Sequence, residues 1–322
     1  MKKTVKALAA LLLCTLLLGC GKELPPEPKR TLVGFSQLGA ESDWRVANTA
    51  SMMQALSEEN GFDLLYDNAR QKQENQLVAV RNFIVQGVDI ILIAPAAETG
   101  WDAVLQEARD AKIPVIIVDR EVAVEDTDLY LTQIGSDFLT EGKHAVAWLE
   151  ERLGTTPAEI LHIQGTEGST AQLMRTKAID DAVQTHGDWQ FAAKLSGDFT
   201  ESKAYEEVRD FLKTGVPFNV IYSENDNMSF GAMRALDEAG ITYGQGGQVA
   251  IISFDAVRRA LTACMEGKID LCVECNPLHG PRVAELIGQY LSGQAIPKQI
   301  FVEETLFTPD TLTQERIDAR AY

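Results

Sequence analysis

The stretch TLVGFSQLGAESDWRVANTA, residues 31–50, shows how the whole chain is built. Residues 31–37 form a short, mostly apolar run that is typical of a buried β-strand, and a helix is expected from Trp44 to Glu59. Between the strand and the body of the helix stand Glu41, Trp44 and Arg45. Charged groups are costly to bury without partners but are well suited to holding a polar ligand. The rest of the chain decides between packing and binding.

The same alternation of strand and helix continues to the end of the chain. Apolar runs predict strands at residues 31–37, 62–67, 89–95 and 113–120, and again at 159–165, 189–199, 218–226, 248–255 and 270–276. Helical patterns separate them, at residues 74–86, 101–111, 171–183, 201–213, 228–239, 256–265 and 281–291. Strands that are apolar on both faces and separated by helices predict parallel sheets covered on each side. We therefore expect an α/β fold with two doubly wound, Rossmann-like lobes.

Polar and aromatic side chains stand at or after the ends of seven of these strands. In doubly wound sheets, ligands bind outside the carboxyl ends of the strands. A single polar residue there means little, because turns favour Asp and Asn anyway. Polar or aromatic residues at the ends of seven strands together predict a binding site at one edge of the sheets. The side chains that they supply are Glu41, Trp44, Arg45, Asp119, Arg120, Arg175, Phe199, Asn225, Asp255 and Asn276.

These residue types favour a pocket for a polyhydroxyl ligand. Carboxylates, amides and guanidiniums suit vicinal hydroxyls, which both donate and accept hydrogen bonds, and aromatic faces suit the C–H side of a sugar ring. Each residue also has a structural interpretation. Asn225 could be a helix cap without a role in binding, and Arg175 could lie on a solvated helix face. Trp44 could be a core residue, in which case its removal would lower stability without a ligand; we expect it instead to line a cleft.

Enzyme and nucleic-acid functions find little support. The chain has no G-x-S-x-G, no H-E-x-x-H, no P-loop and no dinucleotide glycine fingerprint, and its four histidines are scattered. We expect no enzyme activity, no cofactor and no metal. Lys and Arg number 29 against 47 Asp and Glu, for a net charge of −18. A surface this acidic repels phosphate backbones, so we expect no nucleic-acid partner.

The N-terminal segment predicts export. A basic stretch precedes a 13-residue apolar core, too short for a membrane-spanning helix of about 20 residues, so residues 1–19 are interpreted as a signal peptide. The sequence LLGC at residues 17–20 resembles a bacterial lipobox, which implies lipidation of Cys20. Residues 20–30 would then be a polar, Pro-rich tether. The alternative is an ordinary signal peptide with an incidental cysteine. We expect an extracytoplasmic protein whose only link to the membrane is the lipid.

Three further cysteines, Cys264, Cys272 and Cys275, remain in the expected mature chain. The last two form a C-x-x-C inside a predicted strand, where a three-residue offset would put the thiols on opposite faces. A metal site there is not expected. A Cys264–Cys272 disulfide is compatible with an exported protein, and buried free thiols are the other interpretation.

Several stretches together resemble a known family: VGFSQLGAESDWR, QKQENQ, PVIIVDR, IQGTEGST, SGDFT, ENDNM and SFDA. They are similar to the type I periplasmic sugar-binding proteins of ABC transporters. The nearest branch is that of galactofuranose-binding proteins, with ribose- and galactose-binding proteins more distant. The resemblance implies a Venus-flytrap architecture, in which two lobes joined by a three-segment hinge close on a sugar. The first lobe would span residues 31–135 plus 276–303, and the second residues 136–275 plus 304–322.

The resemblance also implies sugar contacts at specific positions. Matching the motifs residue by residue implies contacts from Glu41, Ser42, Trp44, Arg45, Asp119, Arg120, Arg175, Phe199, Asn225, Asp255 and Asn276. Two positions depart from the family pattern. Leu173 stands where the ribose branch has an arginine, and the segment around Asn276 lacks a glutamine often found there. These departures argue against ribose and leave the exact sugar open.

The function that follows is transport. We expect a monomeric, lipid-anchored solute-binding protein that captures a monosaccharide, in a furanose form such as galactofuranose, and delivers it to the permease subunits of an ABC importer. The alternative is a sugar sensor that presents the ligand to a chemoreceptor or sensor kinase. An effector domain of a repressor would need a helix-turn-helix where this chain has its signal peptide.

Overall fold

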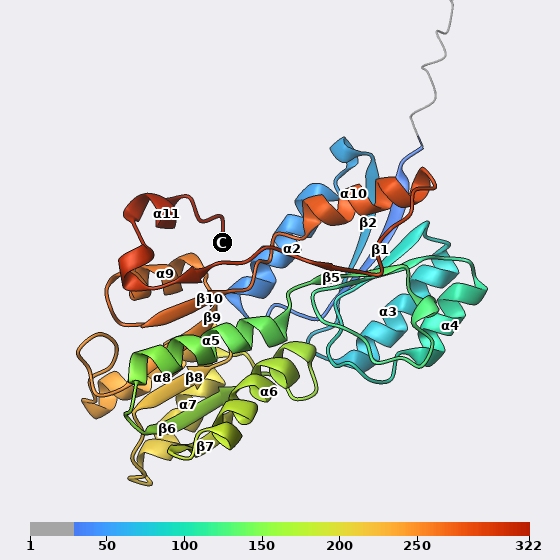
Figure 1. The fold of residues 1–322 in the computed structure, drawn as a ribbon. Coiled ribbons are helices and arrows are strands. Elements are labelled where there is room, and N and C mark those ends of the chain that lie inside the picture. The colour runs from blue at the N-terminus through green and yellow to red at the C-terminus, as the bar shows by residue number, and fades with distance from the viewer. Residues whose placement is uncertain (1–28) are drawn as a thin grey trace, which may run out of the picture. The chain divides into compact units, whose positions relative to one another are not determined.

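The computed structural model describes residues 29–322. Within them, two α/β sheets each carry helices on both faces (Figure 1). The predicted α/β class, with two doubly wound lobes, is confirmed. Cys20 and the expected signal peptide lie outside the described residues. No helix within the described part of the chain has the length and apolar character needed to cross a membrane.

Sheet one has the strand order β11-β5-β4-β3-β1-β2, and its pairings are parallel. Its strands are β1 (Thr31–Gln37), β2 (Phe62–Asn68), β3 (Ile90–Ile93), β4 (Val115–Val118), β5 (Thr132–Gly135) and β11 (Gln299–Phe301). Its helices are α2 (Asp43–Ala55), α3 (Gln73–Gln86), α4 (Asp102–Asp110) and α10 (Gly280–Leu291), with short 3₁₀ turns η1 (Glu58–Asn60) and η2 (Thr127–Leu129). The first helix is therefore shorter than the sequence predicts, because η1 forms a separate turn.

The side chains of β3 show why sheet one needs helices on both faces. All four residues of this strand are buried. Leu92 packs in one apolar cluster with Met52 of α2, whereas its neighbour Ile91 packs in another with Phe83 of α3. Successive strand residues point to opposite faces, so a strand this apolar is stable only when both faces are covered.

Sheet two has the order β12-β10-β9-β8-β6-β7. Its strands are β6 (Ala158–Gln164), β7 (Trp189–Ser196), β8 (Val220–Ser223), β9 (Ala250–Asp255), β10 (Leu271–Glu274) and β12 (Leu306–Phe307). Its helices are α5 (Phe138–Leu153), α6 (Thr170–Thr185), α7 (Glu201–Leu212), α8 (Asp226–Ala239), α9 (Arg258–Met265) and α11 (Gln314–Asp318), with a 3₁₀ turn η3 (Pro309–Thr311). The short β12 pairs antiparallel with β10, a departure from the predicted parallel sheets.

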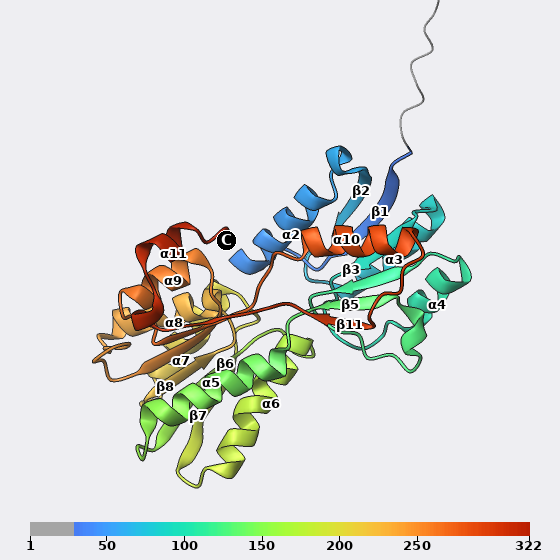
Figure 2. The same cartoon turned by 45° about the horizontal axis from the view of Figure 1, so that its top comes forward.

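Three chain segments run between the sheets (Figure 2). The first joins β5 to α5, the second joins β10 to α10, and the third joins β11 to β12. The third arrives at the carboxyl end of β10, where the backbone N–H of Glu274 donates to the carbonyl of Thr305. Arrival at that end makes β12 run opposite to β10. Each strand thus belongs to one of the two sheets. The residue limits of the two lobes remain a prediction.

The three described cysteines are buried free thiols. Cys264 and Cys272 lie in one apolar cluster and are not bridged, so the disulfide left open by the sequence is absent from the described residues. Cys275 lies just beyond the end of β10 rather than inside a strand, and it enters the second crossing segment.

Candidate functional site

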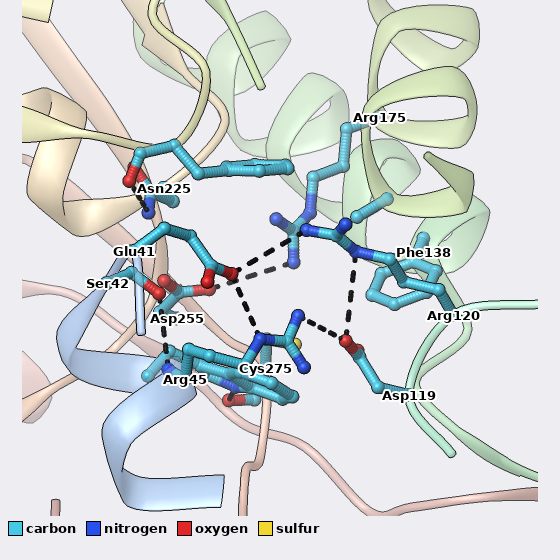
Figure 3. Close-up of a pocket in the computed structure, with 13 residues that line it drawn as sticks. Glu41, Ser42, Arg45, Asp119, Arg120, Phe138, Arg175, Asn225, Asp255 and Cys275 are labelled. Carbon is cyan, nitrogen blue, oxygen red and sulfur yellow. Dashed lines mark hydrogen bonds and ion pairs between the residues drawn. The ribbon is translucent and has the colours of Figure 1, made fainter. Parts of the chain in front are cut away.

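A small cavity between the carboxyl ends of the two sheets collects most of the predicted side chains (Figure 3). Its volume is about 30 Å³, far below the roughly 300–1,000 Å³ typical of small-molecule sites, so the side chains that line it stand close together. Ten of the eleven predicted binding residues line it, and Asn276 does not. The lining residues are Glu41, Ser42, Trp44, Arg45, Asp119, Arg120, Phe138, Ala171, Arg175, Phe199, Asn225, Asp255 and Cys275.

Arg45 organises the part of the cavity that sheet one contributes. Its Nε donates to Glu41 Oε1 at 3.0 Å, and its Nη2 donates to Asp119 Oδ2 at 2.7 Å. Its third nitrogen, Nη1, lies 3.4 Å from Gln37 Oε1. The two carboxylates raise the pKa of Arg45 although burial alone would lower it. Each nitrogen of this guanidinium is therefore held by the protein, and its role toward a ligand is to fix Glu41 and Asp119.

Arg120 stands beside this network with fewer partners. Its Nη1 donates to the carbonyl of Ala96 at 3.1 Å, but its distances to Glu41 and Asp119 are 4.0 and 3.8 Å. Burial and repulsion from Arg45 lower its pKa to about 10. A guanidinium is a rigid fork of donors. Arg120 can therefore give N–H groups to oxygen atoms of a ligand without breaking a strong ion pair.

One carboxylate oxygen at the centre of the cavity has no hydrogen-bond partner. Glu41 uses Oε1 for Arg45, while its buried Oε2 is unpaired among the described residues. A buried oxygen without a partner loses roughly 1–3 kcal/mol of solvation. Figure 3 shows this carboxylate directed toward Arg45 and Arg120 across the cavity. A ligand hydroxyl at this point would satisfy the free oxygen.

Asp255 places a second acidic group at the end of β9. Its nearest cation is Arg175, at 3.9 Å from Oδ1, and burial raises its pKa well above the ordinary value. Its backbone has φ = 106° and that of Ala256 has φ = 58°, a left-handed region that side chains rarely adopt. Asp226 stabilises this turn, since its Oδ2 accepts from the N–H of Val257 at 2.8 Å. Asp119 and Phe199 also have positive φ, and such strain is common at ligand sites.

Arg175 is not on a solvated helix face, because it is only 2% exposed. Its Nε donates to Glu141 Oε2 at 2.7 Å, and its Nη1 donates to the carbonyl of Glu224 at 2.6 Å. The guanidinium also lies over the rings of Phe138 and Phe254, at 5.3 and 4.7 Å from their centroids. Arg175 reaches the cavity from α6 as a positioned charge rather than as a flexible one.

Trp44 is both a core residue and a residue that lines the cavity, the two roles that the sequence left as alternatives. It lines the cavity, yet it is only 4% exposed and packs in the large apolar cluster of sheet two. Its indole Nε1 donates to the carbonyl of Cys275 at 2.7 Å. The expectation that its loss would leave the unliganded fold almost unchanged therefore does not fit this packing.

Phe199 is the aromatic residue that β7 delivers to the site. Its ring fills the space beside Gly165, where an added Cβ would lie 2.0 Å from the ring. The guanidinium of Arg120 lies 5.3 Å from the ring centroid. Trp44 and Phe138 complete an aromatic lining that suits the C–H faces of a small ring.

Two predicted residues act as helix caps as well as lining the cavity. The side chain of Ser42 accepts from the N–H of Arg45 and begins α2, and the side chain of Asn225 accepts from the N–H of Met228 and begins α8. Asn225 also donates to the carbonyl of Phe199 at 3.3 Å. The helix-cap interpretation of Asn225 is thus correct, but its amide still faces the cavity.

Asn276 is the predicted residue that the structure leaves out of the cavity. Its side-chain oxygen accepts from the N–H of Leu278 at 3.0 Å, and its neighbour Cys275 lines the cavity instead. Phe138 and Ala171 also line the cavity and were not predicted from the sequence. Phe138 follows a helix cap just after β5, a signal that could have found it, whereas the sequence around Ala171 marks only a helix start.

One group of possible metal ligands lies close together within residues 29–322. One ligand atom from each of Glu141, Cys275 and Glu304 lies within 4.8 Å of the others. Arg175 already neutralises Glu141, and burial raises the pKa of the Cys275 thiol well above its usual value. These conditions favour protons over a metal cation at this position.

A sequence profile described as a periplasmic binding protein domain matches residues 33–295. This match covers most of the chain. The chain belongs to the periplasmic binding protein family. The type I fold and the position of the cavity at the carboxyl ends of both sheets agree with this membership.

Three relatives place this periplasmic binding protein within the family. The galactofuranose-binding protein YtfQ of Escherichia coli (strain K12) is 37% identical over 287 residues, 88% of this chain and 89% of that protein. A structure from Mycobacterium smegmatis in complex with β-D-fucofuranose has 37% identity and a TM-score of 0.84, covering 90% of this chain and 93% of that one. The binding component of the arabinose ABC transporter from Shewanella sp. ANA-3, bound to α- and β-L-arabinofuranose, has 39% identity and a TM-score of 0.84, covering 90% and 96%.

Ribose-binding relatives are more distant. The ribose import binding protein of Salmonella typhimurium is 26% identical over 237 residues, 73% of this chain and 77% of that protein. The predicted resemblance to type I sugar-binding proteins, with the galactofuranose branch nearer than the ribose branch, is confirmed. The names of these relatives describe binding proteins rather than enzymes.

Proposed function

We propose that this periplasmic binding protein captures a neutral monosaccharide in its furanose form outside the cytoplasmic membrane and delivers it to an ABC importer. The observation that carries this proposal is the network in which Arg45 fixes Glu41 and Asp119, with Arg120 and Glu41 Oε2 left over for a ligand. Fixed acceptors beside a free guanidinium suit adjacent hydroxyls, which donate and accept at once.

The net charge of the cavity supports a neutral ligand. Three guanidiniums, on Arg45, Arg120 and Arg175, stand against the carboxylates of Glu41 and Asp119 and of Glu141, the ion-pair partner of Arg175. Burial favours the neutral form of Asp255, since it raises the pKa of that carboxyl group. A sugar acid or an amino sugar would add a charge without a partner in a buried site, which is costly. The furanose form is supported by the galactofuranose, fucofuranose and arabinofuranose named for the three relatives.

Ring-locked sugars test the furanose preference directly. A 5-deoxy-L-arabinose can close only through O4 and forms a furanose, whereas a 4-deoxy-L-arabinose can close only through O5 and forms a pyranose. We expect calorimetric titration to show binding of D-galactose, D-fucose or L-arabinose, and of the 5-deoxy but not the 4-deoxy analogue. Tighter binding of the 4-deoxy analogue would contradict the furanose proposal.

The membrane anchor is a second part of the proposal. We propose that Cys20 is acylated, that the protein is a monomer, and that the lobes have the limits 31–135 plus 276–303 and 136–275 plus 304–322. Cys20→Ser should release the protein from membranes or block its processing. Membrane fractionation and intact-mass measurement check this outcome, and an unchanged mass and fractionation in the variant would contradict lipidation.

A further inference from the structure

The three segments that cross between the sheets meet at one half-buried carboxyl group, that of Glu304. Its Oε1 accepts from the hydroxyl of Ser136 and from the backbone N–H of Asn276, the latter at 2.9 Å. Ser136 follows β5 in the first crossing, Asn276 follows β10 in the second, and Glu304 lies between β11 and β12 in the third. A single oxygen atom therefore links all three crossings.

The same carboxyl group is connected to the sugar cavity through two side chains. A carboxyl oxygen of Glu304 lies within 4.8 Å of one of Glu141. Glu141 Oε2 accepts from Arg175 Nε and faces Arg175 Nη2, both at 2.7 Å. Arg175 lines the cavity and lies 3.9 Å from Asp255. The path from the crossings to the cavity thus runs from Glu304 to its neighbour Glu141 and from there to Arg175.

Acidic groups outnumber cations around Glu304. Arg175 of α6 is the cation that acts on it, and this guanidinium already serves Glu141 and Asp255. The groups that face Glu304 from the neighbouring elements are Asp137, Glu141 and His144 from the start of α5, Glu274 and Cys275 from β10 and its end, and Arg175 from α6. Glu274 is paired with Arg320 and hydrogen-bonded to Tyr322, so Arg320 is not free to serve Glu304.

The hydrogen bonds leave a defined place for a proton. Both protein donors reach Oε1 of Glu304, which leaves its other oxygen free among the described residues. Glu141 Oε1 is buried and has no hydrogen-bond partner there. A proton on the free oxygen of Glu304 gives this orphaned acceptor a donor. Burial, followed by repulsion from Glu141, raises the pKa of Glu304 to about 9, and burial also raises the pKa of Glu141.

We propose that Glu304 carries a proton at neutral pH, shares it with Glu141, and is a positioning residue that holds Arg175 in the sugar cavity. This inference rests on the proposed function for its binding readout. When Glu304 loses the proton, two carboxylates compete for one guanidinium in a low-dielectric site, which weakens the hold on Arg175. Sugar affinity then falls as the pH rises.

The affinity of the wild-type protein should be measured with whichever of D-galactose, D-fucose and L-arabinose binds in the titration proposed above. It should be constant from pH 6 to 8 and weaken by about threefold or more by pH 9.5. The loss of one proton allows at most about tenfold per pH unit. Glu304→Ala should weaken binding about fivefold or more at every pH, while Glu304→Gln, a neutral isostere, should recover most of that loss and remove the fall between pH 8 and 9.5. The exposed neighbour variant Glu303→Gln is the matched control and should behave as wild type.

An infrared measurement separates this inference from the proposed function because it needs no sugar. At pH 7 the C=O band of a protonated carboxyl should be stronger in wild type than in Glu304→Gln, and that difference should vanish above pH 10. Absence of the band difference, or a Glu304→Gln variant that keeps the wild-type pH profile, would overturn the inference. If no sugar binds to any variant while the band difference is present, the proposed function is wrong but the protonation of Glu304 is still supported.

Discussion

The two sheets contribute unlike halves to the cavity. Sheet one supplies a cross-linked charged network, in which the Arg45 guanidinium is within 3.0 Å of both Glu41 and Asp119. Sheet two supplies two aromatic rings, the held side chains of Arg175 and Asn225, and one carboxyl group, Asp255, whose nearest cation is 3.9 Å away. The carboxylates of the first half are therefore fixed before a ligand arrives, whereas Asp255, the carboxyl group of the second half, has contacts still to make. Preorganised donors and acceptors lose less entropy on binding, so we expect the sheet-one half to dominate affinity.

Removal of Asp119 should have the largest effect. Asp119→Ala takes one carboxylate from the network and leaves Arg45 buried with Glu41 as its remaining ion-pair partner, which costs about 3–5 kcal/mol of stability when such pairs are broken. Sugar affinity should fall by at least about thirtyfold, or roughly 2 kcal/mol. Calorimetric titration and melting curves without sugar measure the two effects, with exposed Asp188→Ala as the control. Equal losses from Asp119→Ala and Asp255→Ala would erase the proposed difference between the halves.

Trp44 belongs to both halves, because it lies on α2 beside sheet one and packs in the apolar cluster of sheet two. Trp44→Ala should weaken sugar binding about thirtyfold and lower the unfolding free energy by about 3–5 kcal/mol, since a buried aromatic and its bond to Cys275 are both lost. The same two measurements apply. A refolded variant that melts lower but keeps wild-type affinity would make Trp44 a purely structural residue.

The two arginines of sheet one should respond differently to the same change. Arg120→Met should weaken binding about tenfold, or roughly 1.4 kcal/mol, with little loss of stability, because Arg120 has no strong ion pair and is repelled by Arg45. Arg45→Met should lower stability strongly, because it strands two buried carboxylates. Melting temperatures of the unliganded variants decide this point. A larger stability loss for Arg120→Met would reverse the assignment of the two roles.

Asn276 should give the smallest effect on affinity. Its side chain bonds to the backbone of Leu278 and does not line the cavity, so Asn276→Ala should change the sugar Kd by less than about twofold. Titration of this variant beside wild type is sufficient. A loss of tenfold or more would show that Asn276 contacts the sugar after all, as the family resemblance implied.

Much of the fold could be predicted because it depends on patterns local in the chain. Apolar runs on strands and amphipathic stretches between them predict covered parallel sheets wherever they occur. Local capping chemistry is also readable, and the cap at Asn225 was foreseen. The antiparallel β12 was not, because a two-residue strand has too little pattern to reveal its direction.

The two α/β lobes, the strand ends where polar residues gather, and ten of the residues that line the cavity could be predicted from the sequence alone. Which atoms of those residues are free depends on contacts that form only in the folded protein. Arg45 and Arg120 look alike in the chain, yet one is held by partners up to 74 positions away and the other keeps donors for a ligand. No local sequence pattern marks Glu304, whose carboxyl group is shared by the three crossings. Local periodicity sets the elements, but hydrogen-bond satisfaction and desolvation depend on residues that only folding brings together.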